Sequence, residues 1–124
     1  MNITEDYVSY EVAKLLEEKG FDEKTLSYYE DNVLCHGDWF EWNRSPLGHI
    51  AAPTHQRAMK WLREVHKISI EITSTGYLIA GDATWGCDIK AGHRLYYQHI
   101  TNEKSYESCV EAALKYSLEN LIQL

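Results

Sequence analysis

The sequence predicts a small α+β domain in which three helices cover one face of an antiparallel sheet of about five strands. Three observations predict this fold. Apolar residues recur at helical spacing in three segments, other segments alternate apolar and polar side chains, and the connections between the strands are short. Because short connections favour antiparallel neighbours, the order of elements is expected to be α-β-β-α-β-β-β-α.

The first helix is predicted near residues 8–19, where Val8, Val12 and Leu16 fall on one helical face. Gly20 is expected to end it, because glycine adopts the left-handed backbone conformation easily. Phe21 would then pack on the last turn, as the apolar residue of a Schellman motif does.

A β-hairpin is predicted next, from the runs Leu26–Tyr29 and Val33–His36. Asp31 and Asn32 lie between the two runs, and both residue types suit a tight turn.

Residues 37–53 are predicted to be irregular, because Gly37, Pro46, Gly48 and Pro53 interrupt them. A long loop in so small a domain is often functional, and tryptophan and arginine dominate the hot spots of protein interfaces. The alternative is that the rings fold back as a lid on the sheet. We call this stretch the aromatic segment, and its candidate binding residues are Trp39, Phe40, Trp42 and Arg44.

The second helix is predicted near residues 55–66, because Pro53 disfavours helix before it and Thr54 can cap the helix that begins after it. Opposite its apolar stripe lies a set of cations that could contact phosphates, or could form an ordinary solvated face that pairs with the acidic first helix. This candidate basic face consists of Arg57, Lys60, Arg63 and Lys67.

Three strands and a helix complete the chain. Residues 68–73 alternate isoleucine with polar residues, residues 77–79 are expected to continue that strand, and further strands are predicted at 83–89 and 95–100. The last helix is predicted near residues 106–122, from a wide apolar face that includes Cys109 and Leu114. From the second helix onward, the order α-β-β-β-α is shared with the double-stranded RNA-binding fold, which is an analogy at the level of fold.

Composition bounds the class of protein. The chain has 124 residues, of which 44% are hydrophobic and 25% charged, and a single domain spanning 1–124 is expected. The net charge of −7 disfavours non-specific nucleic-acid binding, and residues 1–32 alone contribute nine acids and three bases.

No apolar run reaches the roughly 20 residues that span a bilayer, and the N-terminus lacks the features of a signal peptide. Three widely spaced cysteines fit a reducing compartment, so a cytoplasmic protein without membrane association is expected.

The sequence contains few residues in the spacings that are typical of metal-binding or catalytic sites. The six histidines show no ligand spacing and no CxxC occurs, so neither a metal nor another cofactor is predicted. No GxSxG, HExxH or glycine-rich phosphate loop occurs, which disfavours an enzyme. Cys109 is expected in the core, Cys87 is expected to be buried too, and no catalytic residue is assigned.

The stretch APTHQRAMKWLREVHKISIEI, residues 52–72, resembles a family of small uncharacterised α+β proteins from the genomes and prophages of gut anaerobes. The segments YEVAKLLEEKGFDE and SYESCVEAALKYSLENLI resemble the same family, whereas residues 33–50 and 74–100 do not match it residue by residue. The resemblance implies a compact α+β domain and an origin on a mobile element. It implies no activity.

The sequence supports three functional hypotheses. The first is a small binding or adaptor protein of mobile-element origin, which uses the aromatic segment for a protein partner or for self-association. The second is a nucleic-acid-associated regulator, against which the acidic composition argues. The third is a small enzyme whose site assembles from dispersed residues.

Overall fold

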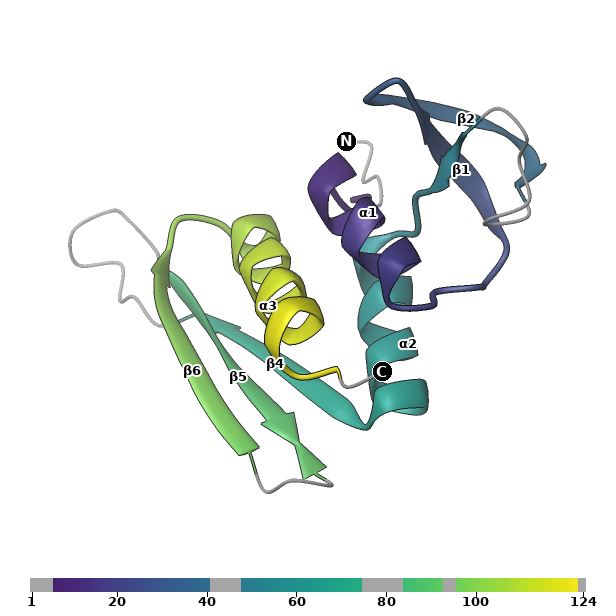
Figure 1. The fold of residues 1–124 in the computed structure, drawn as a ribbon. Helices are drawn as coiled ribbons and strands as arrows, with labels where there is room; N and C mark the ends of the chain where they lie inside the picture. The colour runs from purple at the N-terminus through teal and green to yellow at the C-terminus, as the bar shows by residue number, and fades with distance from the viewer. Residues whose placement is uncertain (1–5, 41–47, 75–83, 93–95, 123–124) are drawn as a thin grey trace. The chain divides into compact units, whose positions relative to one another are not determined.

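The structure is a computed structural model that describes residues 6–40, 48–74, 84–92 and 96–122. Among these residues the chain forms three helices and two antiparallel sheets of three strands each, so the predicted α+β class is confirmed (Figure 1). The elements are α1 (Tyr10–Glu18), β1 (Thr25–Glu30), β2 (Val33–Phe40), β3 (Ile50–Ala51), α2 (His55–His66), β4 (Ile68–Ser74), β5 (Trp85–Ala91), β6 (Tyr96–Glu103) and α3 (Tyr106–Asn120).

The prediction of one sheet of about five strands is wrong. The strands form one sheet in the order β2-β1-β3 and a second in the order β4-β5-β6. The missed element is β3, which pairs with β1 through Tyr28↔Ala51 and Tyr29↔Ile50. Because β3 occupies the edge of β1 that β2 leaves open, the hairpin completes a sheet of its own.

The residues fall into two compact units, Met1–Ala58 and Met59–Gln123, and the boundary lies within α2. The prediction that three helices cover one face of one sheet is therefore wrong as well. In the first unit α1 contacts β3, and in the second unit α3 contacts all three strands of its sheet. That residues 1–124 are one domain stays a prediction.

The predicted end of the first helix and the predicted hairpin turn are both found in the first unit. Gly20 has a φ of +94°, and the amide of Phe21 donates to the carbonyl of Leu16, which is the bond that defines a Schellman motif. Asp31 and Asn32 both have positive φ, as a two-residue hairpin turn between right-twisted strands requires. The hairpin is longer than predicted, since β2 continues to Phe40 into the segment expected to be irregular.

An aromatic contact joins α1 to the hairpin. The Tyr29 hydroxyl donates to the carbonyl of Val8 at 2.6 Å, and its ring meets that of Tyr10 edge to face, with centroids 5.6 Å apart. Val12 and Leu16 are at most 1% exposed, which confirms the predicted apolar face of the first helix at these two positions. Val8 is buried as well, but it precedes the helix, which begins at Tyr10 and not at residue 8 as predicted.

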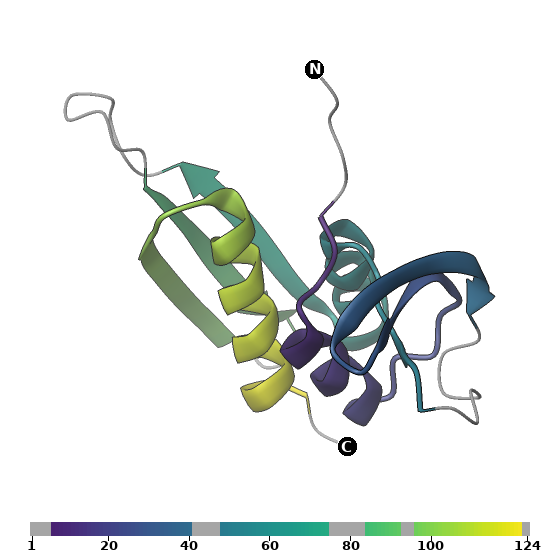
Figure 2. The same cartoon turned by 90° about the horizontal axis from the view of Figure 1, so that it is seen from above.

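In the second unit, α3 lies across one face of the sheet β4-β5-β6 (Figures 1 and 2). Ile68, Cys87 and Ile89 are fully buried, whereas Glu71 and Lys90, which have the opposite parity along their strands, are exposed. Ser105 caps α3 through a capping box with Ser108, near the predicted start of that helix. Residues 77–79, where strand was predicted, lie outside the described residues.

We expect Leu62→Ala and Leu114→Ala each to lower the free energy of unfolding by roughly 2–5 kcal/mol, the usual cost of emptying a core leucine site. Both side chains are 0% exposed in the structure. Chemical denaturation measures the change. Leu26→Ala is the matched control, because Leu26 is 53% exposed and its loss should cost far less. A cost below about 1 kcal/mol for both buried positions would contradict this packing.

Candidate functional site

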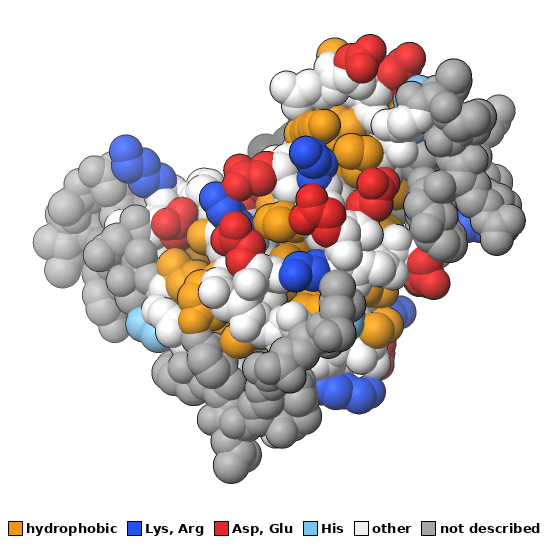
Figure 3. Space-filling model, viewed as in Figure 1, with side chains coloured by type: hydrophobic (Ala, Val, Ile, Leu, Met, Phe, Trp, Pro, Cys, Tyr) orange, Lys and Arg blue, Asp and Glu red, His pale blue; other side chains and the backbone are white. Residues whose placement is uncertain are grey.

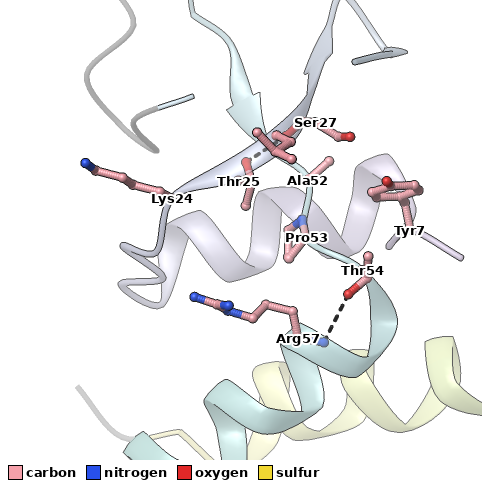
Figure 4. Close-up of a pocket in the computed structure, with 9 residues that line it drawn as sticks. Tyr7, Lys24, Thr25, Ser27, Ala52, Pro53, Thr54 and Arg57 are labelled. Atoms are coloured by element: carbon pink, nitrogen blue, oxygen red, sulfur yellow. Dashed lines mark hydrogen bonds between the residues drawn. The ribbon is translucent and has the colours of Figure 1, made fainter. Parts of the chain in front are cut away.

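A cavity of about 300 Å³ lies within the first unit, where β1, the residues before α1 and the start of α2 meet (Figure 4). We call it the Arg57 pocket. It is lined by Tyr7, Lys24, Thr25, Leu26, Ser27, Ala52, Pro53, Thr54 and Arg57.

Backbone pairing holds the three walls of the Arg57 pocket together. The Ala52 amide donates to the carbonyl of Ser27 at 3.0 Å, and the Val8 amide donates to the carbonyl of Pro53 at 3.1 Å. Tyr7 and Thr54 form an isolated antiparallel bridge. The pocket is therefore built on paired backbone from three separate segments.

Hydroxyl groups line part of the pocket. Thr25 and Ser27 alternate with Leu26 on β1, so both face the interior and are 7% and 1% exposed. The Thr25 hydroxyl donates to the carbonyl of Ser27 at 2.7 Å. Thr54 accepts from the Arg57 amide at 3.2 Å, which confirms Thr54 as the cap of α2.

Two cations from distant parts of the sequence line the Arg57 pocket. Lys24 precedes β1 and Arg57 lies in the first turn of α2, and Figure 4 shows both side chains extending toward the same side. Arg57 Nη2 donates to Glu23 Oε1 at 2.8 Å, with the two side chains 50% and 43% exposed. So exposed an ion pair is screened by solvent and contributes little to stability.

Two of the amide groups at the start of α2 are already used within the protein. The His55 amide donates to the carbonyl of Asp6 at 2.8 Å, and the Arg57 amide donates to Thr54. The groups that line the Arg57 pocket include the charged side chains of Lys24 and Arg57.

The four residues of the predicted basic face are all exposed. Among them, Arg57 lines the Arg57 pocket and pairs with Glu23. The Lys67 ammonium donates to the carbonyl of Glu64 at 3.0 Å, close to the end of α2. On the face of the molecule seen in Figure 3, acidic and basic side chains are interspersed.

The aromatic segment is mostly beyond what the structure describes. The backbone of Trp39 and Phe40 belongs to β2. Their side chains lie outside the description, and so do residues 41–47 with Trp42 and Arg44. The prediction that this segment binds a partner remains a prediction.

Sequence reasoning missed two polar pairs that join neighbouring strands. Ser27 Oγ lies 2.6 Å from His36 Nδ1, and Asp88 Oδ1 lies 2.5 Å from His99 Nδ1. Each pair consists of direct cross-strand partners in an antiparallel ladder. Only knowledge of the register could have revealed them, since the partners are 9 and 11 residues apart in sequence.

The Asp88–His99 pair fixes the chemistry of one imidazole. A carboxylate only accepts hydrogen bonds, so Nδ1 of His99 carries a hydrogen, and in the neutral form of the ring Nε2 is then the acceptor. The His99 side chain is 46% exposed. Within the described ranges, no group of three or more His, Cys, Asp or Glu side chains is positioned to hold a metal ion.

The chain was compared with known proteins, and no family model, curated protein or solved structure matches it. The resemblance to a family from gut anaerobes and prophages therefore stays a prediction. Over the described residues, none of the helices is long and apolar enough to span a membrane.

We expect Asp88→Ala to shift the neutral His99 ring toward the tautomer that carries its hydrogen on Nε2. The physical reason is the loss of the acceptor that holds the hydrogen on Nδ1. Nitrogen NMR of the imidazole measures the two tautomers. Glu71→Ala is the control, because Glu71 lies directly across from Asp88 on β4 and contacts Lys90 at 3.9 Å. An Nδ1–H population that is equal in the wild type and in Asp88→Ala would contradict the assignment.

Proposed function

We propose that the protein is a small binding protein whose Arg57 pocket takes an anionic ligand, such as one bearing a phosphate or carboxylate group. One observation carries the proposal: Lys24 and Arg57 line the same cavity in a chain whose net charge is −7. Lys24 is one of only three bases among residues 1–32, which hold nine acids. Two cations at one cavity in so acidic a region support an anionic ligand, although one of them, Arg57, is paired with Glu23.

The side chains around the cations suit an anion. The guanidinium of Arg57 presents five N–H donors, and its ion pair with Glu23 uses Nη2. The hydroxyls of Tyr7 and Thr54 add polar atoms that can donate to ligand oxygens. Glu23 is then a competitor, because its carboxylate occupies a donor that the ligand would use.

An enzyme with a dispersed site is a weaker proposal. Nucleophilic catalysis needs a base that a third group orients, and an accessible nucleophile. Ser27 lines the pocket and its hydroxyl contacts His36, but Ser27 is only 1% exposed. The His36 ring packs near the ring of Tyr7, with centroids 5.2 Å apart, and an aromatic ring does not orient a catalytic base as a carboxylate does. The cross-strand position of the two residues explains their hydrogen bond without a catalytic role.

We expect the wild-type protein to bind inorganic phosphate, and Arg57→Ala and Lys24→Ala each to weaken binding roughly tenfold. Hydrogen bonds to charged groups contribute roughly 1.5–3 kcal/mol, and solvent exposure places these two near the lower limit. Glu23→Gln should tighten binding, because it removes the competing carboxylate. Isothermal titration calorimetry at low ionic strength measures all four affinities.

Lys60→Ala is the matched control, since it removes one positive charge from the same helix at a residue that does not line the Arg57 pocket. It should leave the phosphate affinity within about twofold of the wild type. If Lys60→Ala weakens binding as much as Arg57→Ala, the basic face of α2 binds the phosphate instead. The nucleic-acid hypothesis, which the exposure of Lys60, Arg63 and Lys67 supports, would then take precedence.

We further propose that the aromatic segment contacts a protein partner or a second copy of the chain, as expected of an adaptor, and that the protein originates from a mobile element. Exposing several large rings without a partner is costly, because burial of each is worth roughly 1.5–3 kcal/mol.

Replacing both Trp39 and Trp42 with Ala should abolish self-association in analytical ultracentrifugation, or partner capture. The same replacement should leave the melting temperature nearly unchanged. A loss of several kcal/mol in the free energy of unfolding would mean that the rings belong to the core, and the interaction hypothesis would fail.

A further inference from the structure

Two cysteines meet inside the second unit. Cys87 lies on β5, the central strand of the sheet, and Cys109 lies in the first turn of α3, the helix that packs on that sheet. Both side chains are 0% exposed, and each thiol contributes to the electrostatic surroundings of the other. Both are free cysteines in the structure.

The register of β5 explains why the thiols meet. Cys87 pairs with Ile72 on β4 and with Ile100 on β6, and it has the same parity along the strand as the buried residues Ile89 and Ala91. Its side chain therefore points to the face that α3 covers. Cys109 belongs to the buried residues of α3, the helix that covers this face, so the two thiols share one interior site between helix and strand.

We propose that Cys87 and Cys109 form a redox pair, in which oxidation by a peroxide or by a low-molecular-weight disulfide links α3 to β5 through a disulfide bond. With hydrogen peroxide, the two thiols lose two protons and two electrons as the S–S bond forms, and the peroxide takes up both and is reduced to two water molecules. With glutathione disulfide, one protein thiolate attacks a glutathione sulfur and releases one glutathione. The second protein thiolate then attacks the mixed disulfide and releases the other.

Burial controls the rate of this reaction. It raises the pKa of the Cys87 thiol to about 12, with Cys109 as the next cause, and it also raises the pKa of Cys109. The thiolate is the reactive form, and both thiols are closed off from solvent, so the pair reacts when α3 opens from the sheet. The pair thus responds to sustained oxidation and is slow to react during a brief exposure.

The test uses the full chain carrying Cys35→Ser, so that Cys87 and Cys109 are the two cysteines that remain. After incubation with glutathione disulfide, we expect the intact mass to fall by two hydrogen atoms and a non-reducing peptide map to show Cys87 linked to Cys109. The melting temperature should rise, because the disulfide constrains the unfolded chain, and it should return to its starting value after reduction.

Matched controls carry Cys35→Ser together with Cys87→Ala or Cys109→Ala, and neither should show the mass loss or the rise in melting temperature. The peptide map of the three-cysteine wild type gives a second test that needs no core substitution. The proposal is overturned if the oxidised wild type contains only glutathione adducts or disulfides through Cys35. It is equally overturned if the Cys87–Cys109 link appears only after denaturant unfolds the protein.

Discussion

In both sheets, the register of antiparallel pairing decides which side chains meet. Cys87 faces α3 and Asp88 faces away from it because successive residues of a strand point to opposite sides. The same register sets Asp88 beside His99, and Ser27 beside His36. A shift of one residue in β5 would turn the Asp88 carboxylate toward α3 and Cys87 toward solvent, so the core and the polar pairs depend on one constraint.

Signals that act over a few residues could be predicted from the sequence. Gly20 with Phe21, the Asp31-Asn32 turn and the Thr54 cap each work through their own backbone and its nearest neighbours, so no knowledge of the fold was needed. The division into two sheets could not be predicted, because it depends on β3. A strand of two residues has too little periodicity to detect, and proline and glycine surround it.

Of the residues that line the Arg57 pocket, only Arg57 was named as a candidate binding residue from the sequence. It was named because it belongs to the basic face of the second helix, and not because a pocket was expected there. Arg57 belongs to the helical stripe of cations, but its ion-pair partner Glu23 is 34 residues away in the sequence. Lys24, Thr25 and Tyr7 join it through backbone pairing between distant segments, and no local pattern marks any of them. The aromatic segment has a conspicuous composition, yet composition does not determine whether its rings point inward or outward.

The chemistry of the Arg57 pocket suits reversible binding better than catalysis. Catalysis gains most from groups fixed in a site from which water is excluded, whereas Arg57 and Glu23 are about half exposed. The same exposure makes their ion pair weak, so a ligand anion can take the place of Glu23 at little cost in stability. Under the proposed anion binding, exchange of the Glu23 carboxylate for a ligand anion would keep Arg57 paired with and without ligand, and the affinity would depend on the charge at residue 23.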